Sequence, residues 1–286
     1  MSFFFGTILE KQVLLAGDRM NYDGHDKTTI GPSKIHKINN SIFPVWGGNL
    51  FAGNEILKII RDLCLGSIKL WELEGNRGRD ISKLALSFWK EKVLKDPEAI
   101  TEYKDKGRLL SLNILLGGLD SEDHPFLGNL FDAGNFEIQF YKRPGISVIS
   151  PNTPEIIEWV RGKMREFLTV AMGESEEKQR ELAKQMLPGI IGYVSQHDKF
   201  VSSAGDLFFI HGGGSELFTF GVGRWRGVME RISLYLQSIS ERLEERKRLD
   251  WEKWQRRKGD LTEQRKKRQE RWQAGIDRLF NRFFGV

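Results

Sequence analysis

Cysteine is almost absent from this sequence, because Cys64 is the single example among 286 residues. One thiol cannot form an intramolecular disulfide, and it cannot build a cysteine-rich metal site. The five histidines are scattered without metal-ligand spacing. We therefore expect neither a metal nor a cofactor. The lack of disulfides favours a reducing compartment, and we expect the cytoplasm.

Long apolar runs and the common catalytic motifs are also missing. No apolar stretch approaches the ~18 residues that a membrane-spanning helix needs. The chain has no G-x-x-x-x-G-K-[ST] phosphate loop, no G-x-S-x-G nucleophile elbow and no H-E-x-x-H zinc motif. The segment from His211 to Gly214 resembles an oxyanion segment of esterases, but without a nucleophile elbow we interpret it as a turn between strands.

The positive charge is confined to one end of the chain. The formal net charge is +5, which is typical of proteins that bind nucleic acid or anionic membranes. From Glu241 onward, however, there are 15 basic and 9 acidic residues, a net of +6, and the preceding 240 residues carry a net of −1. The excess therefore belongs to the C-terminal segment, and it says nothing about a site in the body.

The apolar pattern predicts an α+β fold. Strand patterns and helix patterns alternate in blocks of strands, two helices, strands, two helices and strands. We expect two sheets stacked between helical layers, a four-layer αββα sandwich, over residues 1–225, followed by a charged helical tail over 226–286 whose first part docks on the body. The expected strands cover 3–9, 13–16, 34–38, 42–46, 109–116, 126–131, 136–141, 146–149, 206–210 and 216–220, and the expected helices cover 50–63, 81–93, 154–164 and 177–190.

The N-terminus carries the most informative chemistry. Ser2 follows Met1 directly, and a small second residue normally permits removal of the initiator methionine. Removal would leave a serine with a hydroxyl and a free α-amine, which titrates near pH ~8 and can act as a general base. A nucleophile and its base can thus belong to one residue.

Three further residues are of interest because of their distances from Ser2 along the sequence. Asp18 ends an apolar segment, Lys34 begins an alternating one, and Gly48 precedes a helix pattern. They follow Ser2 by 16, 32 and 46 residues. In this spacing, and in Gly6, the sequence resembles the proteasome β-subunit family and its bacterial self-compartmentalising relatives, which are N-terminal nucleophile (Ntn) hydrolases.

The resemblance implies a role for each of these residues. Ser2 Oγ would attack the scissile carbonyl while the α-amine takes its proton. Lys34 would lower the pKa of the nucleophile, Asp18 would hold Lys34, and the Gly48 N–H would stabilise the oxyanion. The competing interpretation is that Asp18 and Lys34 form a plain salt bridge in a related but inactive fold.

The sequence also departs from the family pattern. The usual nucleophile is threonine, whereas Ser2 lacks the γ-methyl group. The later aspartate and serine of the family correspond to Asp198 and Ser202, with a spacing one residue longer. A serine-glycine segment of the family is replaced by Ser150 and Pro151. The resemblance further implies substrate-binding positions at Met20 and Trp46, and the bulk of Trp46 predicts a shallow pocket for small residues, although core packing is an equal alternative.

Partners follow from the same reasoning. The resemblance implies a peptide or protein substrate and a homo-oligomer, with a ring as one form. The tail has three open interpretations: a coiled-coil arm that joins subunits, attraction to anionic membranes, and contact with nucleic acid. The alternative function is a non-catalytic assembly or scaffold protein that retains the fold and acts through its tail.

Overall fold

The computed structural model describes residues 3–22, 28–30, 33–64, 69–96, 111–150, 152–198, 201–221 and 248. The chain divides into two units, Met1–Ile232 and Ser233–Val286. Every described residue except Arg248 belongs to the first unit. The tail expected from residue 226 therefore lies, apart from Arg248, outside the described residues, and its boundary and docking stay predictions.

A five-stranded antiparallel sheet contains the beginning of the described chain. Its strands lie in the order β11-β10-β2-β1-β9, so that β1 is flanked by β2 and β9. The expected hairpin between the first two strands is confirmed, with Ile8 opposite Val13. The strands are β1 (Phe4–Ile8), β2 (Gln12–Asp18), β9 (Ser147–Ile149), β10 (Gly205–His211) and β11 (Gly214–Phe220).

A second antiparallel sheet has the order β5-β6-β7-β8. Its strands are β5 (Ile42–Gly48), β6 (Leu112–Leu119), β7 (Pro125–Phe131) and β8 (Gln139–Tyr141). A short ribbon of β3 (Met20–Tyr22) and β4 (Thr28–Ile30) completes the described strands. The helices are α1 (Leu50–Leu63), α2 (Leu70–Glu74), α3 (Asn76–Phe88), which continues into a π-helical turn (Trp89–Val93), α5 (Pro154–Ala171) and α6 (Glu176–His197).

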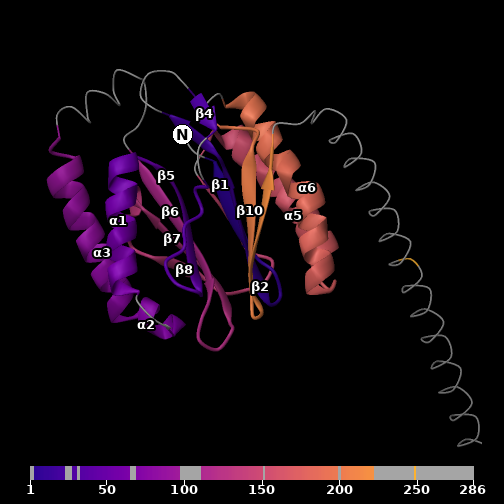
Figure 1. Cartoon of the computed structure of the whole chain (residues 1–286), viewed down its shortest axis with the longest axis horizontal. Coiled ribbons are helices and arrows are strands. Elements are labelled where there is room, and N and C mark those ends of the chain that lie inside the picture. The colour runs from indigo at the N-terminus through magenta and orange to yellow at the C-terminus, as the bar shows by residue number, and fades with distance from the viewer. Residues whose placement is uncertain are drawn as a thin grey trace, which may run out of the picture. The chain divides into compact units, whose positions relative to one another are not determined.

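The two sheets face each other, and helices cover their outer faces (Figure 1). Helices α1 and α3 lie beside the four-stranded sheet, whereas α5 and α6 lie beside the five-stranded one (Figure 1). All seven residues of β2 are buried, as expected for a strand covered on both faces. The predicted α+β class is confirmed.

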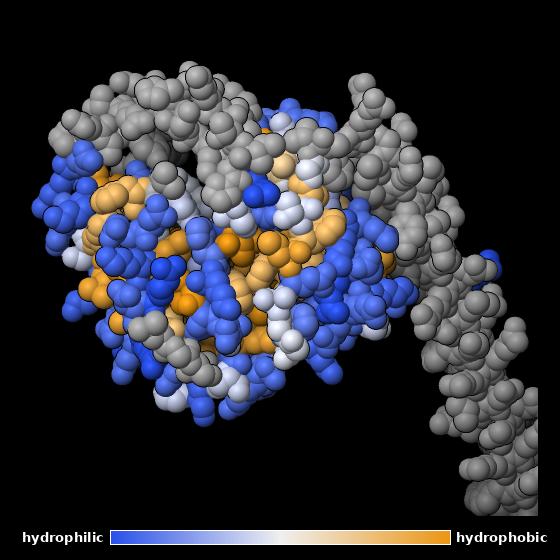
Figure 2. Space-filling model, in the orientation of Figure 1, coloured by the Kyte–Doolittle hydropathy of each residue, from blue (hydrophilic) through white to orange (hydrophobic). Residues whose placement is uncertain are grey.

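Apolar cores hold the layers of the described body together. The core between the sheets includes Phe4, Val45 and Leu127, and another lies beneath α1 and α3 around Ile56, Ile81 and other residues. In the view of Figure 2, apolar residues run through the middle of the described body between hydrophilic flanks. The N-terminal segment is therefore anchored from its first described residues by buried apolar surface.

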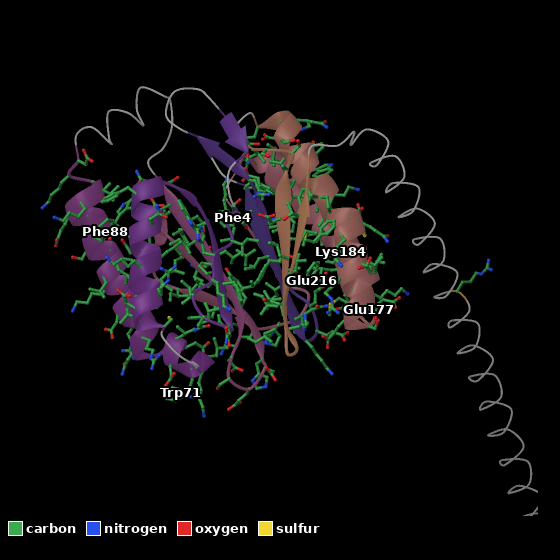
Figure 3. The ribbon with its side chains drawn as sticks, viewed as in Figure 1. Phe4, Trp71, Phe88, Glu177, Lys184 and Glu216 are labelled. Carbon is green, nitrogen blue, oxygen red and sulfur yellow. The ribbon has the colours of Figure 1, made fainter. Side chains whose placement is uncertain are left out.

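On the outer side, α6 is tied to the edge strand β11. Lys184 Nζ lies 2.7 Å from Glu216 Oε1 and 2.8 Å from Glu181 Oε1 (Figure 3). The hydrogen bonds that Lys184 donates to these two carboxylates raise the pKa of Lys184, and the one to Glu216 lowers the pKa of that carboxyl group. The group is partly exposed to solvent, so we assign it a modest role in orienting the helix.

One expected strand is wrong. Residues 34–38 form no strand, and only Ile35 makes an isolated bridge, to Val45. The buried residues of this segment are Lys34 and Ile38, four positions apart rather than two. Lys34 pairs with Asp18, and Ile38 packs in the core beneath the helices. Because both side chains are buried four positions apart, the segment does not alternate between buried and exposed residues as a strand would.

Other differences concern the ends of elements. The strand expected at 109–116 is observed as β6 from Leu112 to Leu119, and residues 109–110 lie outside the described residues. Sequence patterns missed the short elements β3, β4 and α2. Leu84 of α3 is 47% exposed although it is apolar. Among the described residues, no helix combines the length and apolarity needed to cross a bilayer.

Candidate active site

A buried ion pair forms the centre of the candidate site. Asp18 ends β2 and is completely buried, and its Oδ1 lies 2.8 Å from Nζ of Lys34, which is 8% exposed. Burial lowers the pKa of Lys34 below its ordinary value, while the charge of Asp18 and its hydrogen bond oppose this shift. The sequence-predicted pairing of these two residues is thus present.

The same carboxylate fixes the beginning of the chain. The backbone N–H of Phe3 donates to Asp18 Oδ1 over 2.9 Å, and the Asp18 N–H donates to the Phe3 carbonyl oxygen over 3.0 Å. Ser2 lies outside the described residues, as does the side chain of Met20. Asp18 therefore holds both Lys34 and the residue that follows Ser2.

A loop before β10 reaches the other oxygen of this carboxylate. The backbone N–H of Ser202 donates to Asp18 Oδ2 over 3.4 Å. The Ser202 hydroxyl is engaged with Ala204, because it donates to the Ala204 carbonyl over 3.0 Å and accepts from the Ala204 N–H over 2.9 Å. Ser202 thus contacts Asp18 through its main chain and uses its side chain to shape the loop.

The segment between β9 and α5 supports the site from a third direction. Phe4 and Ser150 exchange two hydrogen bonds, from the Phe4 N–H to Ser150 Oγ and from the Ser150 N–H to the Phe4 carbonyl. Asn152 Nδ2 donates over 3.2 Å to Oδ2 of Asp198, which follows the end of α6. The predicted site residue Asp198 is therefore held by Asn152, a contact that the sequence did not indicate.

A second buried carboxylate lies on the neighbouring strand. Asp206 is 1% exposed, its Oδ1 accepts from the Thr219 hydroxyl over 2.7 Å, and its Oδ2 lies 3.7 Å from Arg19 Nε. Arg19 follows Asp18, and its N–H donates to the Ala204 carbonyl. These contacts bind the end of β2 to β10 and its preceding loop.

Gly48 closes β5 in a conformation that favours glycine. Its φ is +121°, and a Cβ at this position would lie 2.0 Å from the carbonyl oxygen of Ser111. Asn49 then begins α1 by accepting the Ala52 N–H at its side-chain oxygen over 2.8 Å. Gly48 thus stands immediately before a capped helix N-terminus, where backbone donors concentrate.

Trp46 is packed between β5 and α1. It is 8% exposed, and its six-membered ring lies so close to Gly53 that a Cβ there would be 2.4 Å from Cζ3. His36 stacks on the indole with ring centroids 6.3 Å apart. The indole Nε1 is buried and has no hydrogen-bond partner among the described residues. Trp46 therefore belongs to the core beneath α1.

The arrangement of elements is similar to that of a solved structure. Anbu from Hyphomicrobium sp. strain MC1, in a Gly-1 mutant, matches with a TM-score of 0.55 and 13% identity, over 84% of this chain and 97% of the Anbu chain. The fold is proteasome-like. Eukaryotic HslV from Trypanosoma brucei is also similar, with a TM-score of 0.46 and 13% identity over 73% of this chain and 99% of HslV. No protein-family model and no curated protein sequence matches the chain.

On this proteasome-like fold, hydrogen bonds bring Asp18, Lys34 and Ser202 together with Phe3. Asp198 is held through Asn152, and Gly48 and Trp46 lie at the end of β5 on the opposing sheet. Sequence reasoning missed the supporting contacts of Phe3, Ser150 and Asn152. Within the described part of the chain, no three acidic, histidine or cysteine side chains gather as a metal site.

Proposed function

We propose that this protein is a proteasome-like Ntn amide hydrolase, a peptidase that uses Ser2 as nucleophile after removal of Met1. The observation that carries the proposal is that Asp18 Oδ1 accepts from the Lys34 ammonium and from the Phe3 N–H at once. Ser2 is covalently bonded to that Phe3 nitrogen. The proposed nucleophile is therefore the direct neighbour of a buried cation–carboxylate pair.

The fold supports the same proposal. We propose that the stacked sheets with their outer helices are the four-layer αββα sandwich of the Ntn hydrolases. The likeness to Anbu supports this assignment at the level of fold. The chemistry is argued separately, from the residues of this chain.

The proposed reaction is acyl transfer to the serine hydroxyl. The Ser2 α-amine takes the proton of Oγ as Oγ bonds to the scissile carbonyl carbon, and the carbonyl oxygen becomes an oxyanion. Collapse breaks the C–N bond, and the leaving amine receives the proton from the α-ammonium. Water then attacks the ester with the α-amine as base, which releases the acid and regenerates the hydroxyl.

Lys34 and Gly48 would supply the electrostatics. A positive charge near the α-amine disfavours its protonation. An ammonium at Lys34 therefore keeps that amine unprotonated at pH 7 and available to accept a proton. The Gly48 N–H precedes the capped start of α1 and is assigned as the oxyanion donor, a contribution of about 3 kcal/mol in the transition state. Asp18 orients Lys34, while Ser202 and Asp198 complete the surrounding polar framework.

We propose that Trp46 and Met20 take part in substrate selection. The indole fills space against Gly53 and His36. A pocket bordered by this ring would be shallow, so we expect cleavage after small residues. A panel of fluorogenic peptides tests this expectation, and a preference for large aromatic residues before the cut bond contradicts it.

The decisive experiment combines mass and activity. Intact-mass measurement should show loss of Met1, and Ser2→Ala should abolish peptide hydrolysis with an unchanged circular dichroism spectrum. Ser87→Ala is the matched control, because this exposed hydroxyl of α3 donates to Glu91 in the π-helical turn that follows. Full retention of Met1 overturns the proposal and leaves the non-catalytic scaffold function. Full activity in Ser2→Ala overturns it differently, because hydrolysis would then use a nucleophile other than Ser2.

Assembly belongs to the same proposal. We propose a homo-oligomer, with a ring as one form, which light scattering after size-exclusion chromatography measures directly. Truncation after Leu243 tests the role of the tail. Loss of assembly supports the coiled-coil arm, whereas unchanged assembly contradicts it, and binding of liposomes and of nucleic acid is then measured.

A further inference from the structure

A groove of about 880 Å³ lies along α3, away from the residues of the candidate active site. Its floor is apolar and is formed by Leu73 of α2, Leu86 of α3, and Ile138 and Phe140 around β8. Leu86, Ile138 and Phe140 are only partly buried, so this apolar surface remains open to a ligand. In Figure 3, Trp71 and Phe88 mark α2 and the end of α3, the two helices that contribute to it.

One rim of the groove is basic. Arg79, Lys83 and Lys90 line it from α3 and its π-helical turn, and all three side chains are exposed. Within the described residues, none of them lies in an ion pair. Of the two acidic residues that line the groove, Glu74 pairs with Lys142, which leaves Glu137 as the opposing charge. The rim therefore carries an excess of positive charge, which attracts an anionic ligand.

The other side of the groove is a sheet edge. β8 is the last strand of its sheet, paired with β7 on one side, and no strand in the described part of the chain pairs with its outer edge. Such an edge presents backbone donors and acceptors that a further extended segment can bind. Edge strands next to side-chain pockets recognise peptides in this way.

We propose that this groove binds an extended acidic segment of a partner protein, which adds to β8 as a strand and directs acidic side chains to the basic rim. Apolar side chains of the same segment would cover Leu86, Ile138 and Phe140. Charge excludes the chain's own tail as the occupant, because the residues from Glu241 onward carry a net of +6. The groove shares no residue with the Asp18–Lys34 pair, so the inference is independent of the proposed hydrolase activity.

The test measures binding of two fluorescein-labelled peptides to the full-length protein by anisotropy. One peptide alternates glutamate with valine, and the other alternates lysine with valine at equal length. We expect saturable binding of the acidic peptide alone, weakened as ionic strength rises past about 0.1 M. Equal binding of both peptides, or none of the acidic one, overturns the proposal.

Variants locate the binding surface. Lys83→Glu/Lys90→Glu should weaken binding of the acidic peptide at least about ten-fold, because it reverses two of the three rim charges. Lys92→Glu/Lys95→Glu changes the net charge equally at exposed positions outside the groove lining and should leave the affinity near that of the native protein. Equal losses in the two variants refute the groove as the site.

A modified probe examines the mode of binding. An acidic peptide methylated on alternate backbone nitrogens cannot pair fully with a strand, so its affinity should fall about ten-fold or more. Unchanged affinity refutes strand addition to β8.

Discussion

Phe3 and Asp18 hold each other by two hydrogen bonds, one from the Phe3 N–H to the Asp18 carboxylate and one from the Asp18 N–H to the Phe3 carbonyl. The first uses a side chain and the second uses the main chain. The start of β1 therefore depends on the same carboxylate that binds Lys34. Structure at the N-terminus and the charge state of the site are consequently linked.

Removal of one partner from the buried pair should be costly. Lys34→Met leaves the Asp18 carboxylate buried without its ammonium, and we expect the free energy of unfolding to fall by about 3–5 kcal/mol. Asp18→Asn/Lys34→Met removes both charges and should regain part of that loss. Urea denaturation of both single variants and the double variant measures this coupling. A Lys34→Met protein as stable as the native one contradicts the buried pairing.

Gly48→Ala should disrupt the junction of β5 with α1. The added Cβ would meet the Ser111 carbonyl at 2.0 Å, in a backbone conformation with φ +121°. We expect a loss of about 3 kcal/mol or more in unfolding free energy. Gly214→Ala is the control, because its φ is +132° but its Cβ would lie in open space. Equal losses in the two variants would show that backbone conformation alone, without the clash, accounts for the effect.

His36 should contribute to acid sensitivity. Burial, aided by the charge of Arg61, lowers the pKa of His36 below its ordinary value of 6.5. Below pH 6.5 the unfolded chain binds a proton that the folded chain resists, so stability falls with pH until the folded pKa is passed. His36→Gln should flatten this decline in melting temperature between neutral and acidic pH. The same substitution at His124, whose side chain is 65% exposed, serves as the comparison, and an identical decline in His36→Gln contradicts the assignment.

Cys64 should be inert in the native protein. It is completely buried, and burial raises its pKa to about 11. At pH 8 only about one thiol in a thousand would be ionised, and a thiolate is the reactive form. Iodoacetamide labelling followed by mass spectrometry should therefore modify Cys64 only after denaturant is added. Rapid labelling of the folded protein would indicate that this region opens.

Much of the fold was accessible from the sequence because its strands and helices have regular apolar patterns. The β1–β2 hairpin and helix α1 are examples, since local spacing alone specifies them. Residues 34–38 show the limit. Their apolar and polar residues alternate as in a strand. The ion pair of Lys34 with Asp18, however, joins residues that are distant in the sequence, and no local pattern reveals it.

The candidate site was predictable only in part for the same reason. Asp18, Lys34 and Gly48 were found through their distances from Ser2 along the chain. The donation from Asn152 to Asp198 joins residues 46 positions apart, and the Ser202 contact with Asp18 joins residues 184 positions apart. Neither has a sequence signature, because each depends on how the strands and helices meet in space.

The contact between Ser202 and Asp18 can form only late in the synthesis of the chain. The two residues are 184 positions apart, so a ribosome that adds about 5–20 residues per second makes Ser202 about 10–40 s after Asp18. Until then Asp18, which binds Phe3, lacks one of its hydrogen-bond donors, and β10 is not available to pair with β2. A nascent chain therefore lacks these two supports of its N-terminal segment until residues 202–211 have been made.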